Sequence, residues 1–210
     1  MAPLAAAEPV AKIARLSVVD AAEVDPSVGR AYSLAASLLE GLGLKVQRFA
    51  TPDIDIARIR VAGFVEAARE APLHFPEVAS DPAGFSDRFR GYLGFAAKFD
   101  DAALAKGRAT LDTAAARLRA VLLDAEAILM PTAPQPAFAH GNAPNNQADF
   151  TGLANIAGLP ALSLPAGWDS DGLPVAVQLV GRPGSETALL DLAARLDAAL
   201  NAYAPPPAYA

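Results

Sequence analysis

Two apolar segments that flank one amphipathic helix set the strongest limit on the fold of this chain. Residues 13–19 (IARLSVV) are apolar and partly β-branched, and residues 44–49 (LKVQRF) alternate like a half-buried strand. Between them, Asp25 and Pro26 predict the start of a helix, and glycines at positions 41 and 43 predict its end. A strand, a helix and a strand in this order are typical of a βαβ unit. We therefore expect an α/β fold.

The rest of the chain continues this alternation. Helices are predicted from Asp53, with interruptions at Pro72 and Pro76, then from about Ser86 to Lys98 and from about Asp101 to Asp124. The second half predicts strands at 127–130, 161–164 and 175–180, a loop at 132–147, a short helix capped by Asp149, a turn at Asp171-Gly172 and a last helix begun by Ser185 and Glu186. The expected architecture is a partial mixed β-sheet flanked by helices.

Composition excludes several classes of protein. Hydrophobic residues make up 53% and charged residues 19%, which is too apolar for a disordered chain. No stretch approaches the roughly 20 apolar residues of a membrane-spanning helix. The net charge is -6, and the lysines and arginines form no basic patch that would bind nucleic acid. The absence of cysteine fits a reducing compartment, so we expect a cytoplasmic protein without a membrane or nucleic-acid partner.

No composition break divides the chain. We expect residues 12–202 to form one unit, and we expect the Ala/Pro-rich residues 1–11 and the tail 203–210 to be disordered. The N-terminal residues show no basic segment followed by a long apolar one, so no signal peptide is expected.

Common catalytic and cofactor motifs are absent from the sequence. There is no GxSxG elbow, no P-loop and no GxGxxG, and Ser185 is better explained as a helix cap. His74 and His140 lie far apart without metal-ligand spacing, and the Asp-Ser-Asp-Gly segment at 169–172 lacks the later glutamate of a calcium loop. We therefore expect no metal and no cofactor.

Two Pro- and Gly-rich segments are more distinctive. LMPTAPQPA (129–137) places the hydroxyl of Thr132 where a strand ends, and loops beyond strand ends build ligand sites in open α/β sheets. NIAGLPALSLPAG (155–167) and DGLPVAVQLVG (171–181) surround apolar strands, with Asn155 before the first and the polar Gln178 inside the second. A buried Gln178 needs hydrogen-bond partners. The alternative is that these residues only maintain turns and the core.

Together with the closing Leu/Ala helix, these segments resemble the C-terminal part of the amidase-signature family. The resemblance extends over about residues 12–200, because the helix that starts at Asp25 and the FAAKFDDAALAKGRATL segment are also similar to the family pattern. It implies about half of the amidase-signature fold and a share in the hydrolysis of amide carbon–nitrogen bonds. Within that fold, Thr132, Pro134 and Asn155 are the expected substrate-pocket residues.

The chain departs from the family pattern at two places. Ala176 stands where the family usually has glycine. More seriously, the family's Gly/Ser-rich signature, with its nucleophilic serine, bridging serine and lysine, has no counterpart here, and no lysine of this chain lies in a matching motif. We therefore assign no catalytic residue and expect the chain to be inactive alone.

Three functional hypotheses follow. In the first, the chain is the scaffold and pocket wall of an amidase, and it binds a small-molecule amide only if an N-terminal amidase half is present; its expected partner is that half or a second copy in a homo-oligomer. In the second, it is a non-catalytic protein that binds another chain through an exposed sheet edge, since half a sheet leaves an unpaired edge and an uncovered apolar face. In the third, it is an independent hydrolase with an unrecognised site.

Overall fold

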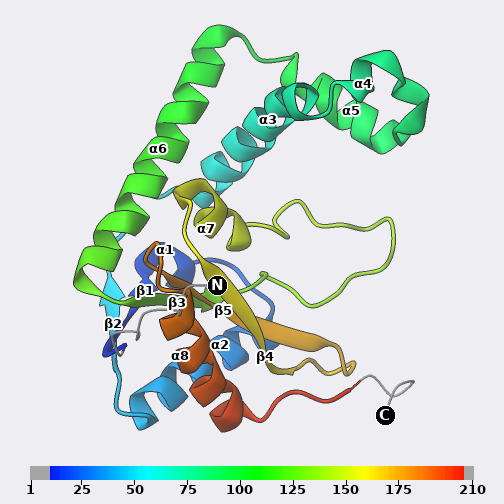
Figure 1. Cartoon of the computed structure of the whole chain (residues 1–210). Coiled ribbons are helices and arrows are strands. Elements are labelled where there is room, and N and C mark those ends of the chain that lie inside the picture. The colour runs from blue at the N-terminus through cyan, green and yellow to red at the C-terminus, as the bar shows by residue number, and fades with distance from the viewer. Residues whose placement is uncertain (1–9, 206–210) are drawn as a thin grey trace, which may run out of the picture.

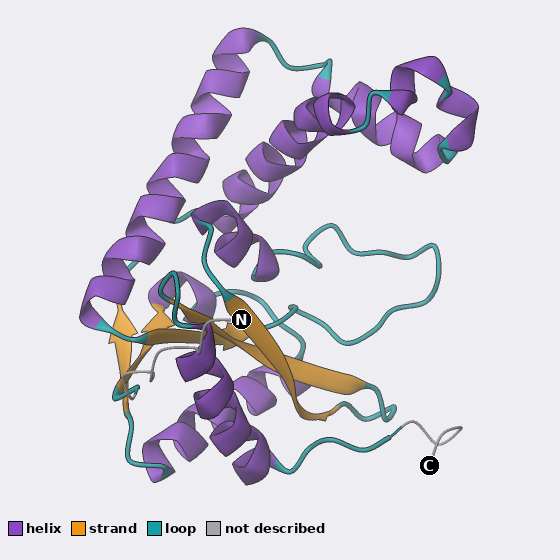
Figure 2. Cartoon of the chain, viewed as in Figure 1, coloured by secondary structure: helices purple, strands orange, loops and turns teal. Residues whose placement is uncertain are grey.

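The computed structural model describes residues 10–205 as a five-stranded sheet with helices on both faces (Figures 1 and 2). The strands are β1 (Lys12–Leu16), β2 (Lys45–Phe49), β3 (Ala127–Pro131), β4 (Ala161–Trp168) and β5 (Pro174–Gly181). The helices are α1 (Ser17–Asp20), α2 (Pro26–Gly41), α3 (Ile56–His74), α4 (Glu77–Ser80), the 3-10 turn η1 (Pro82–Gly84), α5 (Asp87–Ala96), α6 (Asp101–Asp124), α7 (Thr151–Ala157) and α8 (Glu186–Leu200). The expected disordered ends, 1–11 and 203–210, fall mostly outside these described residues.

The predicted βαβ unit is confirmed. β1 and β2 are parallel neighbours, with Ile13 opposite Val46. Their connecting helix α2 begins as predicted, because the Asp25 carboxylate accepts a hydrogen bond from the backbone N–H of Ser27 at 2.8 Å and Pro26 occupies the first turn. After α2, Gly43 has a φ of 85°, which favours glycine.

The sheet is mixed, with the strand order β2-β1-β3-β5-β4. β3 is parallel to β1 and antiparallel to β5, and β4 and β5 form an antiparallel hairpin. The turn of this hairpin matches the prediction at Asp171-Gly172, because Gly172 has a φ of 76° and its N–H donates to the Asp169 carbonyl at 3.3 Å. The predicted α/β class and mixed sheet are therefore confirmed.

Helices enclose the middle of the sheet. Figure 1 shows α2 and α8 against one face, and α7 with the C-terminal end of α6 on the other. Every residue of β3 is buried. The expectation of an uncovered apolar sheet face is therefore wrong for the central strands. Exposed side chains are concentrated on the two edge strands, for example Ala161 and Ser163 of β4. Within residues 10–205, β2 and β4 each pair with a single strand, so each has one unpaired edge.

A network of polar side chains joins α2 to the first strand. The Tyr32 hydroxyl donates to Asp20 at 3.0 Å, and the Arg15 guanidinium bonds Asp20 at 2.8 Å and lies 4.6 Å from the centre of the Tyr32 ring. Arg48 of β2 also bonds Asp20. Burial, reinforced by the Asp20 charge, raises the pKa of Tyr32. The network therefore ties α1, α2, β1 and β2 together.

A helical arm, residues 56–124 from α3 to α6, extends away from the sheet (Figure 1). It has a small apolar core of its own, separate from the main core. This core consists of Val65, Ala68, Ala96 and Leu104, with Tyr92, Phe95 and Phe99 packed against it. The arm thus holds its shape partly through contacts that do not involve the sheet.

Two predicted boundaries are wrong. The strand expected at 13–19 ends at Leu16, because the side-chain hydroxyls of Ser17 and Thr51 bond the backbone where a strand ladder would continue. Pro72 was expected to interrupt its helix, yet it lies inside α3. It is close to the helix end, where its missing N–H costs a single hydrogen bond and the Phe75 N–H still donates to Ala71.

Two predicted caps are also wrong, and a third lacks its side-chain bond. Asp55 rather than Asp53 caps α3, by accepting from the Arg58 N–H at 3.0 Å. Asp149 does not cap α7, because its carboxylate is bound by Arg60. Ser185 occupies the N-cap position of α8 as predicted, but its hydroxyl donates to the Arg182 carbonyl at 2.8 Å and makes no side-chain cap bond. In the first two cases an arginine distant in sequence occupies the expected carboxylate, since Asp53 pairs with Arg117.

Replacement of the α2 cap should destabilise the fold in a pH-dependent way. Hydrogen bonds from the Ser27 hydroxyl and N–H hold the pKa of Asp25 below its ordinary value. The carboxylate therefore stabilises the folded chain at pH values above the ordinary pKa of an aspartate. This contribution is lost as the pH falls through the folded-state pKa. Asp25→Ala should lower the free energy of unfolding by about 1 kcal/mol near neutral pH.

Urea unfolding of the unaltered chain and of Asp25→Ala, near neutral pH and in acid, measures the loss of unfolding free energy at each pH. Asp25→Asn serves as the control, because it keeps the acceptor and loses only the pH-dependent part. An Asp25→Ala loss that is the same at both pH values would contradict the role of the charge.

Gly181, the last residue of β5, should not tolerate a side chain. A Cβ atom built there lies 2.8 Å from Cδ1 of Leu189 and overlaps the Ser185 hydroxyl. Gly181→Ala should therefore lower the free energy of unfolding by about 1–3 kcal/mol, the usual cost of overpacking. The control is Gly41→Ala in α2, where a Cβ meets nothing within 4 Å and stability should stay level or rise. Equal melting curves for the two variants would refute the clash.

Candidate functional site

The candidate site lies where β3 ends, at the PTAP segment (residues 131–134). The Thr132 N–H donates to the Ala176 carbonyl of β5 at 3.0 Å, which continues the strand pairing one residue past Pro131. Pro134 is buried, and its carbonyl accepts from the Asp25 N–H at 2.8 Å, immediately before α2. The segment is thereby fixed at both ends, once to the sheet and once to the residue that caps α2.

Thr132 forms a hydroxyl pair with Ser163 of β4. Their oxygen atoms lie 2.7 Å apart. Register explains the meeting, because Ser163 and Met130 both pair with Gln178 and so point to one face of the sheet, and Thr132 follows Met130 by two residues. Thr132 is partly exposed and Ser163 is exposed, so both hydroxyls can reach a ligand from solvent.

Gln178 lies on the same face of the sheet as Ser163, next to the hydroxyl pair. Its side chain is 2% exposed, and its amide nitrogen donates to the Pro131 carbonyl at 3.1 Å. The requirement for a partner that its burial predicted is therefore met within the PTAP segment itself. This bond holds the backbone from which the Thr132 side chain projects, so Gln178 acts on the position of Thr132.

Asn155 is not hydrogen-bonded to the hydroxyl pair. It is exposed on α7, and within residues 10–205 its side chain hydrogen-bonds neither Thr132 nor Ser163. Arginines of the helical arm hold α7 at both ends. Arg60 binds Asp149 through two bonds of 2.6 and 2.7 Å, and Arg119 donates to the Ala157 carbonyl at 3.0 and 2.7 Å. The structure thus brings Thr132 and Pro134 together, and leaves Asn155 on a separately held helix.

Sequence reasoning missed three residues of this region. Ser163 is a polar residue between two leucines in an apolar strand, the same signal that singled out Gln178. Arg60 and Arg119 gave no such signal, because a charged residue on an amphipathic helix is ordinarily a solvated one. Only the fold shows that their guanidinium groups reach α7.

The site offers hydrogen bonding without an evident nucleophile activator. The hydroxyls of Thr132 and Ser163 can donate to or accept from an amide. Neither His74 nor His140 hydrogen-bonds a serine or threonine in the part of the chain that the structure describes. Among these same residues, no three His, Asp or Glu side chains cluster as metal ligands. No helix among them has the length and apolar character needed to span a bilayer.

Comparison with solved structures supports the fold. The A subunit of glutamyl-tRNA(Gln) amidotransferase from Thermotoga maritima superposes with a TM-score of 0.67 at 28% identity, over 87% of this chain and 41% of that protein. Allophanate hydrolase from Kluyveromyces lactis gives a TM-score of 0.73 at 22% identity, over 92% of this chain and 34% of that protein. At this lower identity the likeness concerns the fold alone.

Sequence comparison gives the family. The A subunit of glutamyl-tRNA(Gln) amidotransferase from Synechococcus sp. (strain CC9311) is 31% identical in an alignment of length 199, and the match covers 81% of this chain and 41% of that protein. The chain thus spans less than half the length of these relatives. The sequence model of the amidase family matches residues 3–190. The chain therefore belongs to the amidase family.

Proposed function

We propose that this chain forms the scaffold and substrate-pocket wall of an enzyme that hydrolyses amide carbon–nitrogen bonds. The observation that carries the proposal is the ordered hydroxyl pair of Thr132 and Ser163 at the end of β3. Membership of the amidase family supplies the reaction class. The Gly/Ser-rich signature that the family uses for acylation is absent from the 210 residues, so the nucleophile and its activators come from a polypeptide segment outside them.

In this proposal the three pocket candidates have different roles. Thr132 hydrogen-bonds the substrate amide, since its hydroxyl is partly exposed and already oriented by Ser163. Pro134 shapes the wall without a side-chain bond, because it is buried and its carbonyl is engaged by Asp25. Asn155 approaches the substrate from α7, the helix that Arg60 and Arg119 hold in place. The preferred partner is an N-terminal amidase half.

The alternative is a non-catalytic protein that binds another chain through the β4 edge. The observation in its favour is the outer side of β4, which has no partner strand within residues 10–205, and whose residues Ala161 and Ser163 are exposed. An added strand could complete the sheet there. The two functions differ in one respect, which is whether residues of the PTAP segment influence the hydrolysis of an amide.

The chain alone should not react as a serine hydrolase. An activated serine is one whose hydroxyl bonds a neighbouring base, and Ser163 bonds a threonine instead. A fluorophosphonate probe followed by peptide mass spectrometry should label no serine, and a simple aryl amide should hydrolyse at the rate of buffer. Stoichiometric labelling of any serine would replace this proposal with an independent hydrolase.

Loss of the Thr132 hydroxyl should weaken substrate binding in a complete enzyme. The test protein is a chimera in which this chain replaces the matching part of the Thermotoga maritima protein. Thr132→Val should raise KM for the amide about tenfold, as expected for one lost hydrogen bond. Thr113→Val, on the exposed face of α6, is the matched control and should leave KM unchanged. An active chimera indifferent to Thr132→Val would contradict the pocket role and favour the alternative.

A further inference from the structure

A groove with a volume of about 600 Å³ lies between α3 and α6 of the helical arm. This volume falls in the range of sites that hold small molecules. The helices touch where Gly107 faces Ala62, and a Cβ atom at Gly107 would lie 3.5 Å from that of Ala62. The neighbouring short side chains Ala57 and Ala103 leave space that longer ones would fill. Val61, Val65 and Leu104 give the groove an apolar lining.

Most of the charged side chains that line the groove are paired with one another, and one is not. Four of its five charged side chains form internal pairs, Arg58 with Asp55 at 3.1 Å and Arg108 with Glu66 at 2.6 Å. Eight residues separate Arg58 from Glu66, so the two pairs lie about 12 Å apart along α3. The fifth is Lys106, whose amino group has no acidic partner within residues 10–205. Among the residues that line the groove, Lys106 therefore carries the one charge outside an ion pair.

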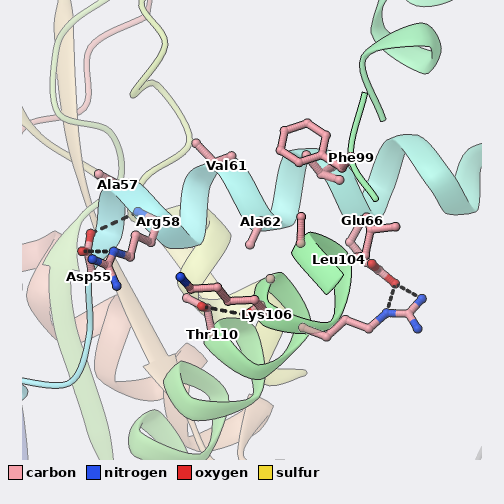
Figure 3. Close-up of a pocket in the computed structure, with 14 residues that line it drawn as sticks. Asp55, Ala57, Arg58, Val61, Ala62, Glu66, Phe99, Leu104, Lys106 and Thr110 are labelled. Carbon is pink, nitrogen blue, oxygen red and sulfur yellow. Dashed lines mark hydrogen bonds and ion pairs between the residues drawn. The ribbon is translucent and has the colours of Figure 1, made fainter. Parts of the chain in front are cut away.

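Figure 3 shows where this charge lies. The Lys106 side chain leaves α6 and extends along the groove toward the end that holds Asp55 and Arg58. Thr110, one turn further along α6, gives its hydroxyl hydrogen to the Lys106 carbonyl and is not free to donate to a ligand. The cation without a paired carboxylate in the lining is thus the Lys106 ammonium group, beside an apolar wall.

We propose that this groove binds a small amphiphilic carboxylate. The carboxylate pairs with Lys106, and the alkyl or aryl body lies on Val61, Val65 and Leu104. Charge complementarity selects an anion, because Lys106 is the one charged lining residue outside the Arg58–Asp55 and Arg108–Glu66 pairs. The distance between these two pairs fits a short molecule better than a long partner helix. The site shares no residue with the PTAP segment, so it is independent of the proposed amidase function.

Titration of the intact chain with octanoate, followed by calorimetry below the concentration at which octanoate forms micelles, tests the proposal. Saturable binding of one octanoate per chain is expected. Octylammonium, which has the same alkyl chain and the opposite charge, should bind at least about tenfold more weakly. No saturable heat with octanoate, or equal affinity for both compounds, would overturn the proposal without any variant having to fold.

Three variants locate the site. Lys106→Glu reverses the charge at an exposed position and should weaken octanoate binding by about tenfold or more. Ala103→Trp, also at an exposed position, should fill the groove and abolish binding. Lys45→Glu on β2 is the matched charge control and should bind like the unaltered chain. Octanoate affinity that is insensitive to both groove variants would overturn the assignment.

Sedimentation velocity on the same samples separates a ligand site from an interface. The proposal expects the same sedimentation coefficient for the unaltered chain and Ala103→Trp. A dimer that Ala103→Trp converts to monomer would show that a second copy occupies the groove, and would overturn the carboxylate assignment.

Discussion

The burial of β3 is the constraint on which the rest of this structure depends. At β3 the sheet changes from parallel to antiparallel pairing, since β3 is parallel to β1 and antiparallel to β5. All five of its residues are buried, so its two faces must be covered by separate layers of helices. Because the strand then ends in proline, its pairing with β5 stops within one residue, and the chain leaves the sheet at Thr132.

The sequence predicts best those features that local chemistry decides. The helix start at Asp25-Pro26, the hairpin turn at Gly172 and the buried strand at 127–130 each depend on conformational preferences of residues adjacent in the chain. The family resemblance adds the mixed sheet and the position of the PTAP segment. It is also the basis for proposing that the nucleophile lies outside these 210 residues.

Features decided by residues far apart in sequence could not be predicted in the same way. Asp149 and Asp53 looked like caps, but an arginine distant along the chain competes for each carboxylate and forms a stronger, charged hydrogen bond. Ser163 meets Thr132 only through the register of β3, β5 and β4. The groove on the arm depends on which small residues two helices bring opposite one another, and helical periodicity alone does not fix that pairing.

The two arginine contacts to α7 also place this helix between two parts of the structure. Arg60 belongs to α3 and Arg119 to α6, whereas α7 continues directly into β4 through Gly158. α7 is therefore joined to the arm by two charged contacts and to β4, the strand of Ser163, by the covalent chain. One short helix thus connects the arm to the strand that carries half of the hydroxyl pair.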